Sequence, residues 1–196
     1  PETVDCRLDD LTVGAVPPAP SIDPDQGPAV ILYTSGTTGR PKGAVLTHAN
    51  LAANATAVAE ALAVRPGADG DRFLVVLPMF HAFAATVGSL YAVLLRLDDS
   101  QIARWGSVRL CISGGAAMPE AIMQAFEARF AVPILEGDGP TECGPVTCVN
   151  PPVGPRKPRS VGPALPGVEM RIADPDGHWL PDGEHGEVCV RGPSAM

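Results

Sequence analysis

Residues 29–48 read AVILYTSGTTGRPKGAVLTH and join an apolar run, a loop of glycines and hydroxyl side chains, and the start of a helix. The run at 29–34 is short, continuous and rich in branched residues, which is typical of a strand buried on both faces. Thr47 can cap a helix over about residues 48–64. A strand, a glycine-rich loop and a helix in this order indicate an α/β fold.

The same alternation continues along the chain. RFLVVLP (72–78), VRLCIS (108–113) and VPILE (132–136) are expected to form three more buried strands. Pro119 opens a helix between the last two of these strands. Its apolar positions share one face and are Ile122, Ala125, Phe126 and Phe130. Strands and helices that alternate at this spacing predict a parallel sheet with flanking helices.

The composition and hydrophobic pattern divide the chain into three parts, with the second boundary after Asn150. Residues 1–28 are a lead-in rich in proline and aspartate, and 29–150 form the α/β portion. Residues 151–196 contain a proline-rich linker and short runs broken by Asp-Gly turns, which predict a small antiparallel β portion. The linker cations are expected to lie in a solvated loop; they are Arg156, Lys157 and Arg159.

Composition narrows the class of protein. The chain has 196 residues, of which 45% are hydrophobic and 18% charged, as in a globular protein. Its net charge of −8 argues against a nucleic-acid binder, because nucleic acids select basic surfaces. Residues 73–95 carry no formal charge, but Pro78 and His81 interrupt them. We therefore expect a buried strand, a turn and a buried helix there, and no transmembrane segment.

The five cysteines form no CxxC pair, which favours reduced thiols in the cytoplasm; they are Cys6, Cys111, Cys143, Cys148 and Cys189. No zinc site is predicted, because the spacing of the available thiols and imidazoles matches none of the usual zinc patterns. The set considered was Cys143, Cys148, His178 and His185.

The loop after the first strand has the chemistry of a polyphosphate site. Its glycines let the backbone approach an anion, its hydroxyls add hydrogen-bond donors, and Lys42 adds a cation. It is not the common nucleotide P-loop, because Pro41 and Gly43 flank the lysine. An ordinary mobile loop of the same composition is the alternative. The contributing residues are Thr34, Ser35, Gly36, Thr37, Thr38, Gly39 and Gly43.

Three loops leave the carboxyl ends of predicted strands: residues 34–43, 113–117 and 137–142. In a parallel sheet, ligands collect at this edge. All three loops are dense in glycine, and we expect them to meet around one ligand.

The order of the motifs resembles the adenylate-forming superfamily, which contains acyl-CoA synthetases, luciferases and the adenylation domains of peptide synthetases. YTSGTTGRPKGAVLTHANL (33–51) is similar to its phosphate-binding signature. LPMFHAF (77–83), SGGAAMP (113–119), EGDGPTECGP (136–145) and GEVCVRGP (186–193) are similar to its later motifs, in the expected order. Within the superfamily, the chain most resembles bacterial long-chain fatty-acid–CoA ligases.

The resemblance implies an acid–thiol ligase. A carboxylate attacks the α-phosphate of ATP, with Mg²⁺, to give an acyl-adenylate and pyrophosphate, and the thiol of CoA then displaces AMP. By position, the loop from Thr34 to Gly39 with Lys42 would cradle the outer phosphates, Thr141 would bind the α-phosphate, and Glu142 would ligate Mg²⁺. The remaining nucleotide-binding positions are Gly114, Gly115, Ala116, Asp138 and Gly139.

His81 would lie near the acyl and thiol channel, or else be a core histidine between Phe80 and Phe83. Asp138 departs from the family, since an adenine-stacking aromatic is usual there. The family's mobile C-terminal lid domain and a strand–helix–strand segment before VRLCIS have no counterpart in these residues, so exposed sheet edges are expected to favour self-association. The alternatives to a ligase are an ATP- or AMP-binding module without catalysis and an unstable remnant.

Overall fold

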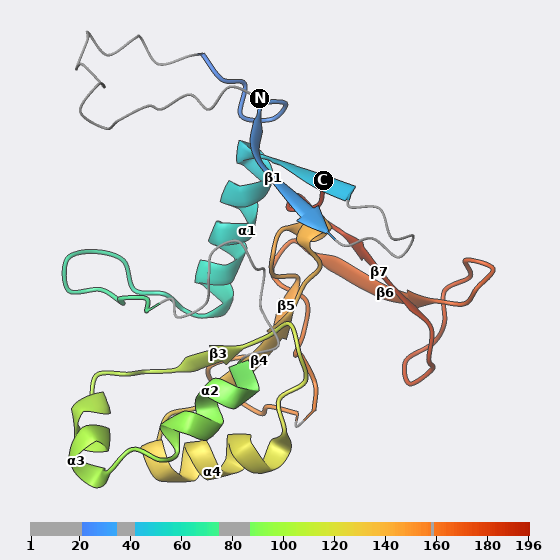
Figure 1. The fold of residues 1–196 in the computed structure, drawn as a ribbon. Helices are drawn as coiled ribbons and strands as arrows, with labels where there is room; N and C mark the ends of the chain where they lie inside the picture. Colours follow the sequence, from blue (N-terminus) through green and yellow to red (C-terminus); the bar gives the residue numbers. More distant parts are fainter. Residues whose placement is uncertain (1–20, 35–41, 75–86, 158) are drawn as a thin grey trace, which may run out of the picture.

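The structure is a computed structural model that describes residues 21–34, 42–74, 87–157 and 159–196. Figure 1 shows the hairpin of the first two strands and the first helix at one end, and the second, third and fourth α-helices with the third and fourth strands at the other. The elements are β1 (Pro28–Thr34), β2 (Lys42–Thr47), α1 (His48–Ala61), α2 (Val87–Leu94), α3 (Asp99–Ile102), η2 (Ala103–Trp105), β3 (Cys111–Ser113), α4 (Glu120–Phe130), β4 (Ile134–Asp138), η3 (Thr141–Cys143), β5 (Cys148–Val149), β6 (Glu169–Ala173) and β7 (Glu187–Arg191).

The first predicted strand exists, but its surroundings differ from the prediction. β1 pairs antiparallel with β2, a strand that the sequence analysis did not predict, with Thr34 opposite Lys42. Ile31 and Tyr33 are 53% and 76% exposed. The expectation of burial on both faces was therefore wrong, because the hairpin has one covered face, where Ala44 and Leu46 of β2 are buried.

Helix α1 begins where the sequence predicts. The Thr47 hydroxyl accepts a hydrogen bond from the backbone N–H of Asn50 (3.2 Å), and the Asn50 side-chain oxygen accepts one from the backbone N–H of Thr47 (3.0 Å). This reciprocal capping box satisfies two donors that a helix start otherwise leaves unpaired. The helix ends at Ala61, three residues before the predicted end, and Ala63 has a φ of 48°.

The central sheet has the order β3–β4–β5. β3 and β4 are parallel, with Ser113 opposite Glu136, whereas β5 runs antiparallel to β4. The fold is thus mixed α/β as predicted, although the parallel pairing is confined to β3 and β4 among the described strands. Of the segments predicted as buried strands, residues 72–74 form an exposed coil, with Phe73 63% and Leu74 87% exposed, and residues 75–78 lie outside the described part.

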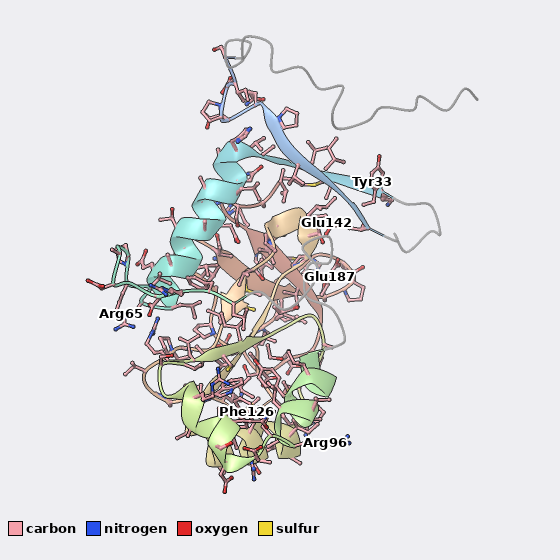
Figure 2. The ribbon with its side chains drawn as sticks, turned by 60° about the vertical axis from the view of Figure 1, so that its left-hand side comes forward. Tyr33, Arg65, Arg96, Phe126, Glu142 and Glu187 are labelled. Atoms are coloured by element: carbon pink, nitrogen blue, oxygen red, sulfur yellow. The ribbon has the colours of Figure 1, made fainter. Side chains whose placement is uncertain are left out.

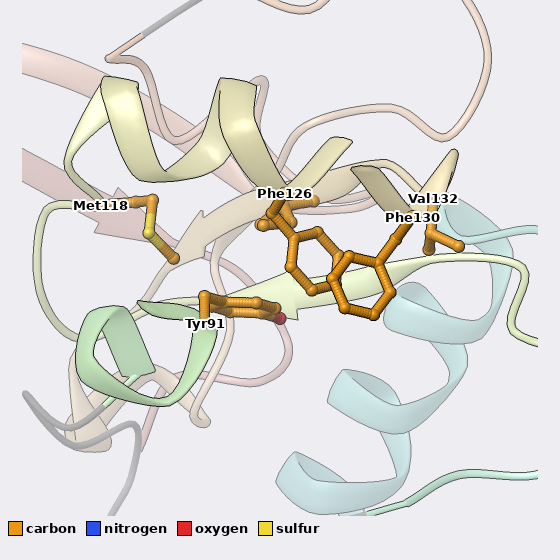
Figure 3. Close-up of a cluster of buried hydrophobic side chains, with 6 residues drawn as sticks. Tyr91, Met118, Phe126, Phe130 and Val132 are labelled. Carbon is orange, nitrogen blue, oxygen red and sulfur yellow. The ribbon is translucent and has the colours of Figure 1, made fainter. Parts of the chain in front are cut away.

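An aromatic cluster anchors α4 to α2 and η2. Figure 3 shows its Tyr91, Phe126 and Phe130 side chains. The Phe126 ring is fully buried, stacks on Phe130 at a centroid distance of 4.2 Å, and meets Tyr91 edge-on at 5.0 Å. The Trp105 ring packs edge-on against both phenylalanine rings. The predicted apolar face of α4 is confirmed for Phe126 and Phe130, but Ala125 is exposed.

An ion-pair group holds the segment after α1 against the start of β3. Asp71 accepts hydrogen bonds from the guanidinium groups of Arg65 and Arg109, each at 2.7 Å, and Arg109 also donates to the carbonyl of Leu62 at 3.3 Å. The hydrogen bonds from Arg65 and then Arg109 hold the pKa of the Asp71 carboxyl well below its usual range. The carboxylate therefore stays charged at neutral pH.

The end of α4 offers a test of backbone strain. Ala131 follows the helix in the left-handed region (φ 53°, ψ 30°), where glycine has no steric penalty. We expect Ala131→Gly to raise the free energy of unfolding by about 0.5–1 kcal/mol. Ala125→Gly, at an exposed interior position of the same helix, should lower it by about 1 kcal/mol. Urea denaturation of both variants measures the two effects, and a loss of stability in Ala131→Gly would contradict this interpretation.

The predicted antiparallel β portion is confirmed. β6 and β7 pair antiparallel, and two Asp-Gly turns lie between them, with Gly177 and Gly183 at φ values of 86° and 95°. In the linker, Arg156 is not merely solvated, because it pairs with Glu127 of α4, while Lys157 and Arg159 are exposed. Among the described residues, no helix is long and apolar enough to cross a membrane.

Candidate functional site

The predicted phosphate loop connects the two paired strands of the hairpin, β1 and β2. The structure describes the two ends of this loop, where the Thr34 hydroxyl lies 3.5 Å from the carbonyl of Lys42 and both residues end paired strands. Lys42 is exposed. The intervening candidates lie outside the described residues; they are Ser35, Gly36, Thr37, Thr38 and Gly39. His81 also lies outside them.

The second predicted loop leaves β3 next to the third. Gly114 is buried, Gly115 has a φ of 75°, and Ala116 is exposed. Ser113, which precedes them, is 1% exposed, and its hydroxyl has no hydrogen-bond partner within the described structure. Because β3 and β4 are parallel neighbours, the 113–117 and 137–142 loops leave the same edge of the sheet, as predicted.

The third loop is held tightly to the strand that follows it. The carbonyl of Asp138 accepts hydrogen bonds from the backbone N–H (2.8 Å) and hydroxyl (3.1 Å) of Thr147. A Cβ at Gly139 would lie 2.7 Å from the Thr147 nitrogen, so this position requires glycine. The Asp138 side chain itself is exposed at the end of β4.

Thr141 and Glu142 follow in η3, and both are half-buried. η3 packs against β2, the strand that starts at Lys42, and Figure 2 shows Glu142 beside the hairpin. The structure therefore packs η3, from the third predicted loop, against β2, the strand that follows the first predicted loop, and places the second loop beside the third. The individual roles of these residues remain predictions.

The charged side chains in this region suit an anionic ligand that binds together with a divalent metal cation. Glu142 makes no ion pair within the described part of the chain, so its carboxylate can accept a divalent cation whose other ligands come from phosphates and water. Burial, and secondarily the Glu142 carboxylate, raises the pKa of the neighbouring Cys143 thiol. Cys143 is thus a neutral thiol and a poor candidate nucleophile.

One group of potential metal ligands lies apart from η3. Asp174, Asp176 and His178 gather in the turn region after β6, where Asp174 accepts hydrogen bonds from the backbone N–H groups of the other two. Those bonds explain the cluster as a local turn. His178 pairs with Asp174 there, and not with Cys143 or Cys148.

Two residues that the sequence analysis did not select also reach this region. Asn50 and Asn54 lie one turn apart on α1, and their side-chain amides bond to the segments around η3. Two amides spaced by four residues in a helix otherwise rich in alanine are a signal that could have identified them.

Comparison with known proteins agrees with these motifs. The sequence model of the AMP-binding enzyme family matches residues 3–98 and 84–196. A long-chain-fatty-acid–CoA ligase of Bacillus subtilis is 31% identical over an alignment 217 positions long, which covers 90% of this chain and 38% of that protein. A sulfoacetate–CoA ligase of Cupriavidus necator is 33% identical, with coverages of 94% and 43%. An indoleacetate–CoA ligase of Aromatoleum aromaticum is 32% identical, with coverages of 93% and 42%.

Solved structures show the same likeness in three dimensions. ATP-bound MatB from Rhodopseudomonas palustris superposes with a TM-score of 0.73 at 32% identity, over 88% of this chain and 41% of that one. The anthranilate CoA ligase AuaEII in complex with anthranoyl-AMP gives a TM-score of 0.72 at 27% identity, over 87% and 40%. The fold is therefore that of part of the large domain of adenylate-forming ligases.

The match to these relatives covers only part of their length. The chain spans 38–43% of the length of the three relatives named above. The two matched segments overlap at residues 84–98, so one stretch of this chain aligns with two separate parts of the family model. This agrees with the expectation that a strand–helix–strand segment before VRLCIS has no counterpart in these residues. With an ordered set of motifs, a family model that covers nearly all of the sequence and the fold of adenylate-forming ligases, this chain belongs to the AMP-binding enzyme family.

Proposed function

We propose that this chain forms the nucleotide-binding part of an acid–thiol ligase that converts a carboxylate, ATP and CoA into an acyl-CoA, AMP and pyrophosphate. The observation that carries the proposal is the packing of η3, with Thr141 and Glu142, against β2, which begins at Lys42. In this proposal the hydroxyl of Thr141, the carboxylate of Glu142 and the ammonium group of Lys42 would act on one ligand. This is the set of groups that a magnesium-bound polyphosphate requires.

Each residue has a distinct task in this proposal. Lys42 and the donors from Thr34 to Gly39 hold the β- and γ-phosphates, while the Thr141 hydroxyl donates to the α-phosphate. Gly114, Gly115 and Ala116 lie along the adenine. Glu142 holds Mg²⁺, which when bound neutralises part of the phosphate charge. Together these groups would orient the α-phosphate for attack by the carboxylate.

We propose a fatty acid as the first carboxylate to test, because LPMFHAF (77–83) and SVGPALPGVEMRIAD (160–174) are most similar to fatty-acid–CoA ligases. Named relatives act on other acids as well, among them sulfoacetate and indoleacetate. What these substrates share is the carboxylate. Activity measured with a panel of fatty, aryl and sulfonated acids therefore distinguishes these classes of substrate.

The test is carboxylate-dependent exchange of labelled pyrophosphate into ATP, measured with the 196-residue chain after its binding of Mg-ATP has been established by calorimetry. Exchange that requires the acid supports adenylation. Binding without exchange supports the alternative function, a nucleotide-binding module without catalysis. A chain that neither binds ATP nor melts cooperatively would be an unstable remnant, and the proposal would be wrong.

Asp138 provides a prediction about affinity. Its exposed carboxylate lies where an adenine-stacking aromatic is usual in the family. We expect Asp138→Tyr to tighten the binding of Mg-ATP by about tenfold, because base stacking contributes roughly 1–3 kcal/mol and a repulsive charge is removed. Asp138→Asn removes the charge without adding a ring and should give a smaller gain. Calorimetric titrations that coincide for the parent and Asp138→Tyr would contradict the placement of adenine here.

A further inference from the structure

The Asn50 side chain makes contacts in two directions at the start of α1. Its oxygen accepts hydrogen bonds from the backbone N–H (3.0 Å) and hydroxyl (2.9 Å) of Thr47, the last residue of β2. Its amide nitrogen donates to the carbonyls of Pro193 and Ala195, each at 2.9 Å. One side chain therefore joins the end of the hairpin strand to residues 192–196, a segment that follows β7 and is named the strap below.

The strap in turn holds η3. The backbone N–H of Met196 donates to the carbonyl of Glu142 at 2.9 Å. Ser194, in the middle of the strap, is 3% exposed. Hydrogen bonds thus connect β2 to Asn50, Asn50 to the strap, and the strap to Glu142, the residue proposed to ligate Mg²⁺.

Asn54 contacts the segment that follows η3. It lies one turn after Asn50 on the same face of α1 and is 4% exposed. Its amide donates to the carbonyl of Val146 at 2.6 Å. At Gly144, directly after η3, a Cβ would meet both the Asn54 amide and the Ser194 Cβ at 3.2 Å, so Asn54, the strap and the backbone after η3 are in close contact.

We propose that Asn50 and Asn54 are positioning residues that set the place of Thr141 and Glu142 relative to the hairpin that carries Lys42. The inference rests on the proposed function, because it concerns the geometry of the same nucleotide site. Asparagine suits the task, since its amide donates while its oxygen accepts. The buried Asn54 amide and the half-buried Asn50 amide would each lose hydrogen bonds if η3 or the strap moved away, so these contacts favour one position of η3.

Asn50→Asp separates the positioning contact from the helix cap. Aspartate has nearly the same shape, keeps the oxygen that accepts from Thr47, and is favourable in the first turn of a helix. It cannot donate to the carbonyls of Pro193 and Ala195. Asn50→Ala also loses this donation without adding a charge, although it removes the cap as well. An effect that both variants share therefore reports the loss of the strap contact.

Two control variants match these changes. Gln101 is the corresponding capping-box residue of α3, where its side-chain oxygen accepts from the backbone N–H of Asp98 at 3.0 Å. Gln101→Glu therefore makes the same amide-to-carboxylate change at a cap that carries no strap. Thr47→Ala weakens the cap of α1 and leaves the Asn50 amide free to donate to the strap.

The measurements are the dissociation constants of Mg-ATP and of AMP, and hydrogen exchange at the backbone N–H of Met196. In both Asn50 variants we expect Mg-ATP binding to weaken about tenfold and the Met196 N–H to exchange faster. AMP binding should weaken less, by about threefold, because AMP keeps the phosphate that Thr141 contacts but lacks the phosphates and the Mg²⁺ that Glu142 serves. Both controls should keep the parent ratio of the two affinities. A loss of folding alone would reduce both affinities in proportion and leave their ratio unchanged.

The outcomes separate the two proposals. If the parent chain binds Mg-ATP and both Asn50 variants keep its ratio of affinities, the positioning role is wrong and the proposed function stands. If the parent does not bind Mg-ATP, the proposed function fails and this role in the nucleotide site fails with it. Unchanged exchange at Met196 in the Asn50 variants would overturn the strap contact independently of any nucleotide.

Discussion

Lys42→Ala is expected to weaken the binding of Mg-ATP to this chain by roughly 10- to 100-fold, which corresponds to the loss of a charge-assisted hydrogen bond. AMP binding should weaken by less than about threefold, because the proposed partners of Lys42 are the outer phosphates, which AMP lacks. Lys42 is exposed at the start of β2, so its truncation should leave the fold intact. Isothermal titration with the two nucleotides gives both constants.

Lys157→Ala is the matched control for this experiment. Lys157 is the other lysine of the chain and is exposed in the linker. Its removal changes the net charge by the same amount, so it corrects for the long-range effect of the charge on an anionic ligand. Equal losses of ATP and AMP affinity in Lys42→Ala, or equal effects of the two lysine variants, would contradict the assignment of Lys42 to the outer phosphates.

Phe126→Ala is expected to lower the free energy of unfolding by about 3–5 kcal/mol, the largest effect on stability that we predict. The ring is fully buried and contacts Tyr91, Trp105 and Phe130, so its removal leaves a cavity that these rigid rings fill poorly. Because a domain of this size has a marginal total stability, the variant should be unfolded or nearly so at 37 °C. Urea denaturation followed by circular dichroism measures the loss.

Phe73→Ala is the corresponding control at the surface. Phe73 is 63% exposed, and its truncation should change stability by less than about 0.5 kcal/mol. A comparable loss in both phenylalanine variants would mean that the aromatic cluster around α4 is not the main core of the chain. A small loss in Phe126→Ala alone would mean that the cluster repacks around the missing ring.

Local sequence signals predicted the individual elements well where neighbouring residues specify them. The helix cap at Thr47, the helix after Pro119 and the Asp-Gly turns before β7 depend on contacts within a few residues, and all three occur in the structure. β2 was missed because the segment GAVLT is short and follows a glycine-rich loop, so its pattern does not distinguish a strand from a helix start. The direction in which strands pair is likewise not visible in such patterns.

For the candidate site, the residue types could be predicted from the sequence, but their contacts could not. Glycines, hydroxyls, Lys42 and Glu142 could be selected from the sequence, because the chemistry of a polyphosphate site requires those residue types and the family motifs order them. The packing of η3 on β2 and the hydrogen bonds of Asn50 to the strap depend on residues more than 90 positions apart. Contacts at such separation follow from the packing of whole elements around a shared core, so no local pattern specifies them, and only the folded chain shows which loops meet.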